Sequence, residues 1–72
     1  MNNKKKENFV RNRLSPLMVD AYDEVLGATY DVKGKSEAVN IHYNDGSIVI
    51  VNVTGDSLAA LVADVLDKVV FN

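Results

Sequence analysis

The clearest pattern in the chain is a strict alternation of hydrophobic and polar residues in its middle third. Every second position is hydrophobic over residues 28–33 and again over residues 39–43, which is typical of strands with one solvated face. The pair Asp45-Gly46 follows, and it is one of the strongest short signals for a hairpin turn. The apolar run 48–53 then supplies a third strand, so the pattern predicts an antiparallel sheet.

Hydrophobic residues at helical spacing flank these strands on both sides. Ser15-Pro16 is typical of a helix start, with Ser as the N-cap and Pro at the first helical position, and Gly27 is a suitable helix end. Asp56 is a suitable N-cap for a second helix over about residues 57–70. We therefore predict an α+β fold: helix, three-stranded antiparallel sheet and C-terminal helix in a single small domain over residues 9–72.

The third strand leaves one question of register open. With two residues in the hairpin loop, Ile48 and Ile50 share a face with Val39, Ile41 and Tyr43. With Asn44 in the loop as well, the residues on that face are Val49, Val51 and Val53, because a slip of one residue exchanges the two faces of a strand.

Either register leaves hydrophobic surface on the other face of the third strand, and the last helix is apolar over an arc of about 200°. A single helix layer covers one face of a sheet, so we predict a homodimer. The alternative is that the first helix covers the second face. On the third strand the candidate interface residues are whichever of Val49, Val51 and Val53 or Ile48 and Ile50 face away from the helix. On the last helix they are Val62, Leu66 and Val70.

Composition limits how so short a chain is stabilised. The chain has 72 residues and no Cys, so it forms no disulfide. Structural zinc sites are built from Cys and His, and His42 is the only residue of either type, which argues against such a site. We expect no metal and no other cofactor. A basic N-terminus without a following signal-peptide stretch, and apolar runs too short to cross a bilayer, predict a cytoplasmic protein with no membrane association.

Charge is distributed unevenly along the chain. Residues 1–13 carry five basic residues and one acid, and the remainder carries three basic residues and nine acids. We expect residues 1–8 to form a disordered basic arm on an acidic body. The arm suits phosphate groups, and the acids of the first helix suit a basic partner. The candidate binding residues are Lys4, Lys5, Lys6, Arg11, Arg13, Asp20, Asp23 and Glu24.

The segment Gly55-Asp56-Ser57-Leu58 resembles the nucleophile block of GDSL-type hydrolases. In that family an Asp and a His beyond the block activate the Ser, but here no His follows Ser57. A Ser without a base is a weak nucleophile, and we interpret the segment as a helix cap. We predict that the protein is not an enzyme and has no catalytic residues.

Two further resemblances concern the whole layout. The element order is similar to that of double-stranded-RNA-binding domains, although the Lys-rich helix start of that family is replaced here by Asp56-Ser57-Leu58. Segments such as Tyr43-Asn44-Asp45-Gly46 resemble those of small accessory proteins of phages and mobile elements in Gram-positive bacteria, among which some anti-CRISPR proteins share the layout.

The second resemblance implies a non-enzymatic interaction protein that acts in the host cytoplasm. We expect an inhibitor of a bacterial defence system, which binds a host protein or sequesters a small signal molecule. The alternative is an accessory protein that binds nucleic acid through the basic arm.

Overall fold

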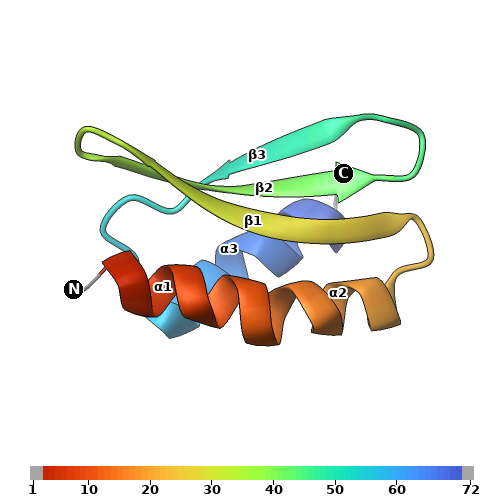
Figure 1. Ribbon diagram of the computed structural model, residues 1–72, viewed down its shortest axis with the longest axis horizontal. Coiled ribbons are helices and arrows are strands. Elements are labelled where there is room, and N and C mark those ends of the chain that lie inside the picture. The colour runs from red at the N-terminus through yellow and green to blue at the C-terminus, as the bar shows by residue number, and fades with distance from the viewer. Residues whose placement is uncertain (1–2, 71–72) are drawn as a thin grey trace.

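The predicted α+β architecture is confirmed by a computed structural model, which describes the backbone of residues 3–70 and the side chains of residues 4–69 (Figure 1). An N-terminal helical segment leads into a three-stranded antiparallel sheet of order β1-β2-β3, and a C-terminal helix follows. The elements are α1 (Asn3–Phe9), the π-helical turn η1 (Val10–Leu14), α2 (Ser15–Ala21), β1 (Val25–Lys33), β2 (Ser36–Tyr43), β3 (Ile48–Asn52) and α3 (Leu58–Val70).

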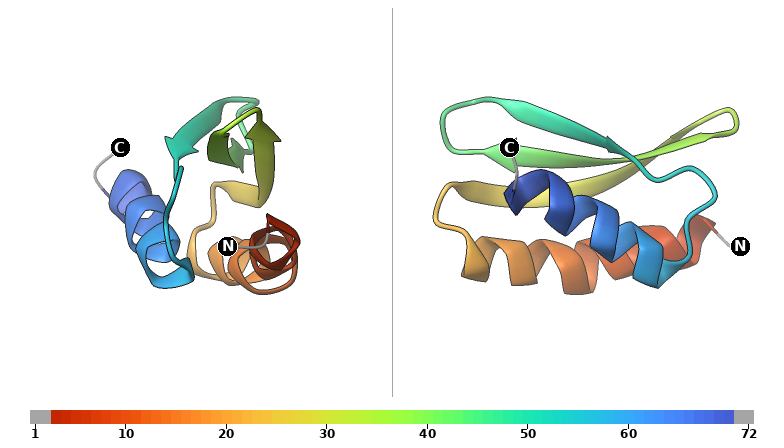
Figure 2. Two further views of the ribbon diagram at one scale, coloured as in Figure 1. Left: turned by 90° about the vertical axis from the view of Figure 1, so that its left-hand side faces the viewer. Right: turned by 180° about the vertical axis from the view of Figure 1, so that it is seen from behind.

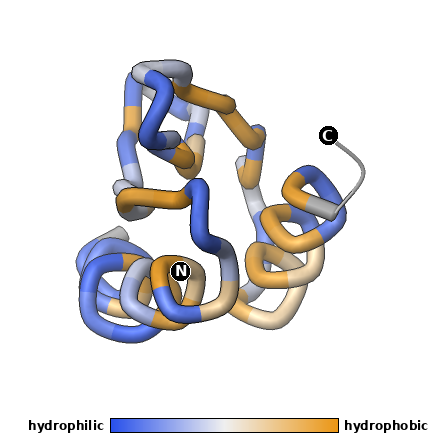
Figure 3. The backbone as a smooth tube through the Cα atoms, turned by 90° about the vertical axis from the view of Figure 1, so that its right-hand side faces the viewer, coloured by the Kyte–Doolittle hydropathy of each residue, from blue (hydrophilic) through white to orange (hydrophobic). Residues whose placement is uncertain are grey.

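Both helical segments pack on the same face of the sheet and enclose one hydrophobic core (Figure 2). The first helical segment contributes Val10, Leu14 and Met18, spaced four residues apart on one side of the helix. Leu61 and Val65 of α3 meet them beneath the strands. Viewed along the long axis, the hydrophilic positions of the first helical segment lie mainly on its outer side (Figure 3). The alternative that the first helix covers the second face of the sheet is therefore wrong.

The hairpin register is settled with Asn44 in the loop. Val39 pairs with Val51 and Ile41 pairs with Val49 across the β2–β3 ladder. Val51 and Val53 are buried in the core and Val49 packs against it, so these three predicted interface residues face inward. Val62 and Leu66 are half-buried on α3, and the side chain of Val70 lies outside the described residues.

The exposed hydrophobic residues of the third strand are instead Ile48 and Ile50. They project from the outer face of the sheet, which no described helix covers.

The N-terminal helical segment is longer than its sequence suggests. Residues 3–8, which belong to the arm predicted to be disordered, form α1 together with Phe9, and Lys6 of this helix is buried. Residues 1 and 2 lie outside the described residues. The helix continues through Ser15, which has helical backbone angles and is not an N-cap. Pro16 has no N–H and crowds the carbonyl four residues before it. The π-helical turn, with the Ser15 N–H bonded to the Val10 carbonyl, widens the helix just ahead of this proline.

The same segment ends earlier than Gly27 and β1 begins earlier than predicted. Leu26 is an extra residue in the β1–β2 ladder, a bulge that lies between Val25 and Gly27. At this point the Ala28 N–H on the edge of β1 donates a 2.9 Å hydrogen bond to Ser15 Oγ. A Cβ on Gly27 would lie 3.2 Å from that oxygen, so glycine permits the close approach of helix and strand.

A buried ion pair joins α1 to β2. The Lys6 side chain is 1% exposed and its Nζ lies 2.5 Å from Glu37 Oε1, which also accepts a 2.6 Å hydrogen bond from the Tyr30 hydroxyl. Glu37 Oε2 accepts the Gly55 N–H at 3.0 Å. The Gly55 N–H, the Lys6 ammonium and the Tyr30 hydroxyl together lower the pKa of Glu37 to about 2. This carboxylate thus ties α1, β1 and the loop before α3 to the sheet.

Two acidic residues, Asp56 and Asp64, lie close together in the same region. A hydrogen bond to Asp64, followed by burial, raises the pKa of Asp56. One oxygen of Asp56 is buried without a protein partner among the described residues. Burial and the nearby Asp64 carboxyl group thus disfavour the charged form of Asp56.

Removing the buried cation should destabilise the fold. Lys6→Ala leaves Glu37 with two of its three partners, and we expect a loss of about 3 kcal/mol in unfolding free energy, measured by urea denaturation. The neighbouring residue Lys5 is exposed, so Lys5→Ala should change stability by no more than about 0.5 kcal/mol. Equal stabilities for the two variants would contradict this role of Lys6.

The depressed pKa of Glu37 also predicts an acid transition. Its folded-state pKa of about 2 lies below the ordinary value of 4.5, so the stabilisation is complete well above pH 4.5 and is lost as pH falls through about 2. The shift corresponds to about 3 kcal/mol. Glu37→Gln should be less stable at neutral pH and should show a weaker decline of unfolding free energy under acid. Parallel declines in the two proteins would rule out this assignment.

Candidate binding cleft

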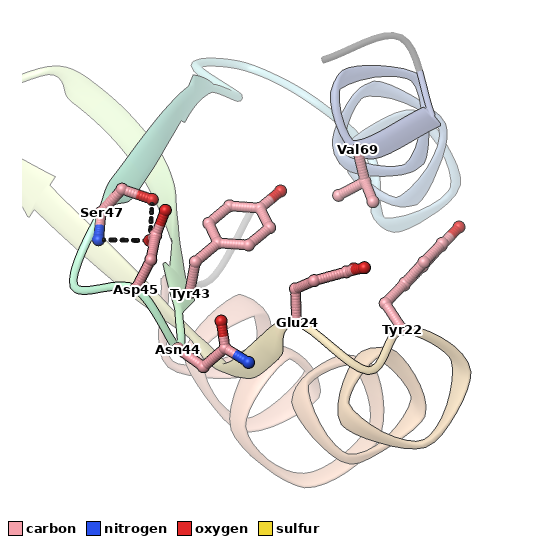
Figure 4. Close-up of a pocket in the computed structure, with 7 residues that line it drawn as sticks. All are labelled: Tyr22, Glu24, Tyr43, Asn44, Asp45, Ser47 and Val69. Carbon is pink, nitrogen blue, oxygen red and sulfur yellow. Dashed lines mark hydrogen bonds between the residues drawn. The ribbon is translucent and has the colours of Figure 1, made fainter.

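A cleft opens at the end of the molecule where β1 begins and the β2–β3 hairpin turns (Figure 4). Its volume is about 340 Å³, at the lower end of the range for ligand sites. Three regions distant in sequence meet there: the turn after α2, the hairpin and the last turn of α3. The lining residues are Tyr22, Glu24, Tyr43, Asn44, Asp45, Ser47 and Val69.

Backbone hydrogen bonds hold the two loops of the cleft together. The Tyr22 N–H closes the end of α2 on the Met18 carbonyl at 2.9 Å, and the Val25 N–H bonds back to the Tyr22 carbonyl at 3.1 Å. The Asn44 N–H donates to the Glu24 carbonyl at 2.8 Å. This last bond crosses from the hairpin to the start of β1, so both loops form one continuous wall.

The hairpin wall is fixed by its own turn. The Gly46 N–H bonds to the Tyr43 carbonyl at 3.1 Å, and Gly46 has φ +89°, a conformation that glycine adopts without strain. Asp45 Oδ1 accepts hydrogen bonds from the Ser47 hydroxyl at 2.6 Å and from its N–H at 2.9 Å, and these bonds lower the pKa of Asp45. The turn therefore presents a charged carboxylate at neutral pH.

Aromatic and acidic side chains alternate across the cleft. The Glu24 side chain extends between the rings of Tyr43 and Tyr22, toward Val69 on α3 (Figure 4). Both tyrosines are half-buried and pack against the core, whereas Glu24 and Asp45 are exposed. A fixed aromatic surface beside accessible carboxylates is the arrangement that binds ammonium and guanidinium groups.

The backbone adds to the negative potential at this end of the molecule. Both α2 and α3 have their C-terminal ends at the end of the molecule where β1 begins (Figure 1). The cleft lies at this end, and the carbonyl ends of helices favour positive charge. No lining residue is basic; Lys68, exposed beside Val69, is the nearest basic residue along α3. The cleft is therefore suited to a cation and disfavours phosphate groups.

The structure places only one of the predicted acidic residues in this cleft. Glu24 lines it, whereas Asp20 is exposed on α2 and Asp23 is exposed in the turn that follows. Neither Tyr22 nor Tyr43 is among the binding residues predicted from the sequence, where Tyr43 was considered only as a strand residue. A signal was present, because Tyr22-Asp23-Glu24 and Tyr43-Asn44-Asp45 repeat one pattern of tyrosine, Asp or Asn, and acid.

The predicted basic residues are divided among different environments. Lys6 is buried, while Lys4 and Lys5 are exposed on α1 and Arg11 donates to Asn8 Oδ1 at 2.9 Å. Lys5 and Arg13 line a groove of about 380 Å³ between the first helical segment and the start of α3. Phe9 is half-buried against the core, which limits its use for stacking on bases.

Ser57 has a structural position. Its Oγ accepts the Ala60 N–H at 3.1 Å, so Ser57 and not the predicted Asp56 is the N-cap of α3. His42 lies on the outer face of the sheet, where its Nε2 is 3.1 Å from Thr29 Oγ1. Ser57 therefore has no imidazole partner within the described part of the chain.

Comparison with known proteins does not assign a function to this cleft. No protein-family model, curated protein or solved structure shows a significant match to the chain. Over the described residues, His, Asp and Glu do not cluster in a way that would hold a metal ion. Within the same residues, no helix has the length and hydrophobicity needed to cross a membrane.

The capping role of Ser57 predicts the effect of its removal. Ser57→Ala leaves the Ala60 N–H without its side-chain acceptor, and the free energy of unfolding should fall by about 1 kcal/mol in urea denaturation. Ser57→Asp, which restores an acceptor at the N-cap, should regain most of that loss. Full stability of Ser57→Ala would show that this bond contributes nothing.

Proposed function

We propose that this protein is a non-enzymatic binding protein whose cleft receives a lysine or arginine side chain of a partner protein. The observation that carries the proposal is the position of the Glu24 carboxylate between Tyr22 and Tyr43, with Asp45 at the rim. The tyrosines supply aromatic surface for the stem and charge of the guest side chain, and the carboxylates accept its hydrogen bonds.

The charge of the cleft distinguishes between the two modes of action expected from the sequence. Many small signal molecules carry phosphate, which the carboxylates of Glu24 and Asp45 repel. A basic side chain on a protein surface meets the opposite charge. The charge of the cleft therefore favours binding of a host protein over sequestration of a phosphorylated signal.

The proposed biological setting follows from the resemblance to phage and mobile-element accessory proteins. A small protein that occupies a basic surface of a defence protein would block nucleic acid or substrate from that surface. We propose inhibition of a bacterial defence system in the host cytoplasm on this basis.

A peptide titration tests the cleft. The probe is a fluorescein-labelled, end-blocked pentapeptide with a central arginine among glycines, and its binding is followed by anisotropy. The matched peptide with citrulline, which keeps the shape of arginine without its charge, should bind at least about fivefold more weakly, a difference of about 1 kcal/mol.

Variants of the chain locate the binding site. Glu24→Gln should weaken arginine-peptide binding about fivefold, because it removes one charge and retains the size of the side chain. Asp31→Asn removes one exposed charge from β1, away from the cleft, and should leave binding unchanged. Equal loss in both variants would show only a general charge effect, and equal binding of arginine and citrulline peptides would refute the proposal.

The groove lined by Lys5 and Arg13 supports a second candidate function, nucleic-acid binding. Two basic side chains and the amides of Asn8 and Asn12 line it, a composition that suits phosphate. Substitutions in this groove distinguish the two candidate functions. Lys5→Ala with Arg13→Ala should abolish any salt-dependent binding of single-stranded oligonucleotides and should leave binding of the arginine peptide intact.

A further inference from the structure

The two edge strands of the sheet, β1 and β3, differ in how well they are protected from pairing with another chain. The β1 edge is closed in part by the bond from the Ala28 N–H to Ser15 Oγ, and it carries a bulge at Leu26. The β3 edge has neither feature, and its sequence Ile48-Val49-Ile50-Val51-Asn52 contains no charge and no proline. Natural edge strands usually carry such features, because they prevent pairing with another chain.

The hydrogen-bond pattern identifies which groups of β3 are available. Tyr43 N–H bonds to the Ser47 carbonyl and Val53 N–H bonds to the Glu37 carbonyl, so the odd-numbered residues of β3 direct their backbone groups toward β2. The backbone groups of Ile48 and Ile50 therefore point to the open edge. Their side chains, 55% and 65% exposed, lie together on the outer face of the sheet.

We propose that β3 pairs antiparallel with β3 of a second copy of this chain, and that the two sheets join into one six-stranded sheet. The pairing places Ile48 opposite Ile50 of the second copy, about a twofold axis at Val49. Each of the two equivalent Ile48–Ile50 pairs exchanges both of its N–H···O=C bonds.

A second copy is the occupant that this edge fits best. A strand without charge brings no like charges together when it pairs with itself, and isoleucine opposite isoleucine is a favourable cross-strand pair. The alternative register, centred on Ile50, would put Ile48 opposite the polar Asn52. Strand addition of this length belongs to the smaller class of interfaces, so the dissociation constant should be micromolar.

Sedimentation equilibrium over about 1 to 1,000 µM tests the pairing, because a micromolar dimer dissociates within this range. The wild-type mass should rise toward twice the 7.9 kDa of the chain. Ile50→Lys adds charge to the open edge without touching the core, and the dimer should weaken at least tenfold. Leu26→Lys is the matched control, because Leu26 is also 65% exposed but lies on the β1 side, and it should associate like the wild type.

Each outcome of this experiment is decisive when circular dichroism shows the variants folded. A wild type that stays at the monomer mass throughout would overturn the proposal and would leave the edge to a partner of another kind. Association that Ile50→Lys does not weaken, or that Leu26→Lys weakens equally, would place the interface elsewhere. If Ile50→Lys fails to fold, Ile50→Thr, which keeps β-branching and is less apolar, provides the same comparison with a smaller expected loss.

Discussion

Burial of the Lys6 ammonium against the Glu37 carboxylate is the polar contact that joins the start of the N-terminal helical segment to the sheet. Glu37 accepts bonds from α1, β1 and the loop before α3, so a single side chain positions three elements. The segment from residue 3 to residue 21 is continuously helical through the π-helical turn. Its far end is therefore placed by two attachments, the ion pair near its start and the Ser15–Ala28 bond near its middle. The cleft depends on this placement, because Tyr22 and Glu24 follow directly where the helix ends.

All the helices lie on one face of the sheet, and this arrangement determines which surfaces remain for binding. The enclosed face uses Val39, Ile41 and Val51 in the core, and the opposite face retains exposed isoleucines at the β3 edge. The two helix ends and the hairpin meet at one end of the molecule and form the acidic cleft. The basic residues of α1 and η1 lie toward the other end (Figure 1). The charge asymmetry of the sequence thus becomes a spatial separation between an acidic cleft and a basic groove, the two candidate binding surfaces.

The sequence predicted the strands, the hairpin and the final helix, because alternation, Asp45-Gly46 and helical spacing are local signals. It misplaced the first helix for a physical reason: Ser15-Pro16 is typical of a helix start, and only the π-helical turn allows a helix to run through it. Burial of Lys6 was equally hidden, because a charged residue enters a core only when a distant partner, here Glu37, neutralises it. The register of the β2–β3 hairpin could not be predicted either, because both faces of β3 are hydrophobic and only the packing in the folded chain decides which face is buried. Of the candidate site, sequence identified Glu24, whereas the role of the tyrosines depends on loops that meet only in the folded chain.

Recognition of a basic side chain by the tyrosine-flanked acidic cleft can be tested by amide chemical-shift mapping, with the end-blocked arginine pentapeptide added to uniformly ¹⁵N-labelled protein. We expect the largest shifts on residues 22–25 and 43–47 and on Val69, and nearly unchanged positions with the citrulline peptide. Shifts centred on Lys5 and Arg13, or equal shifts with both peptides, would show that the cleft does not bind the basic side chain.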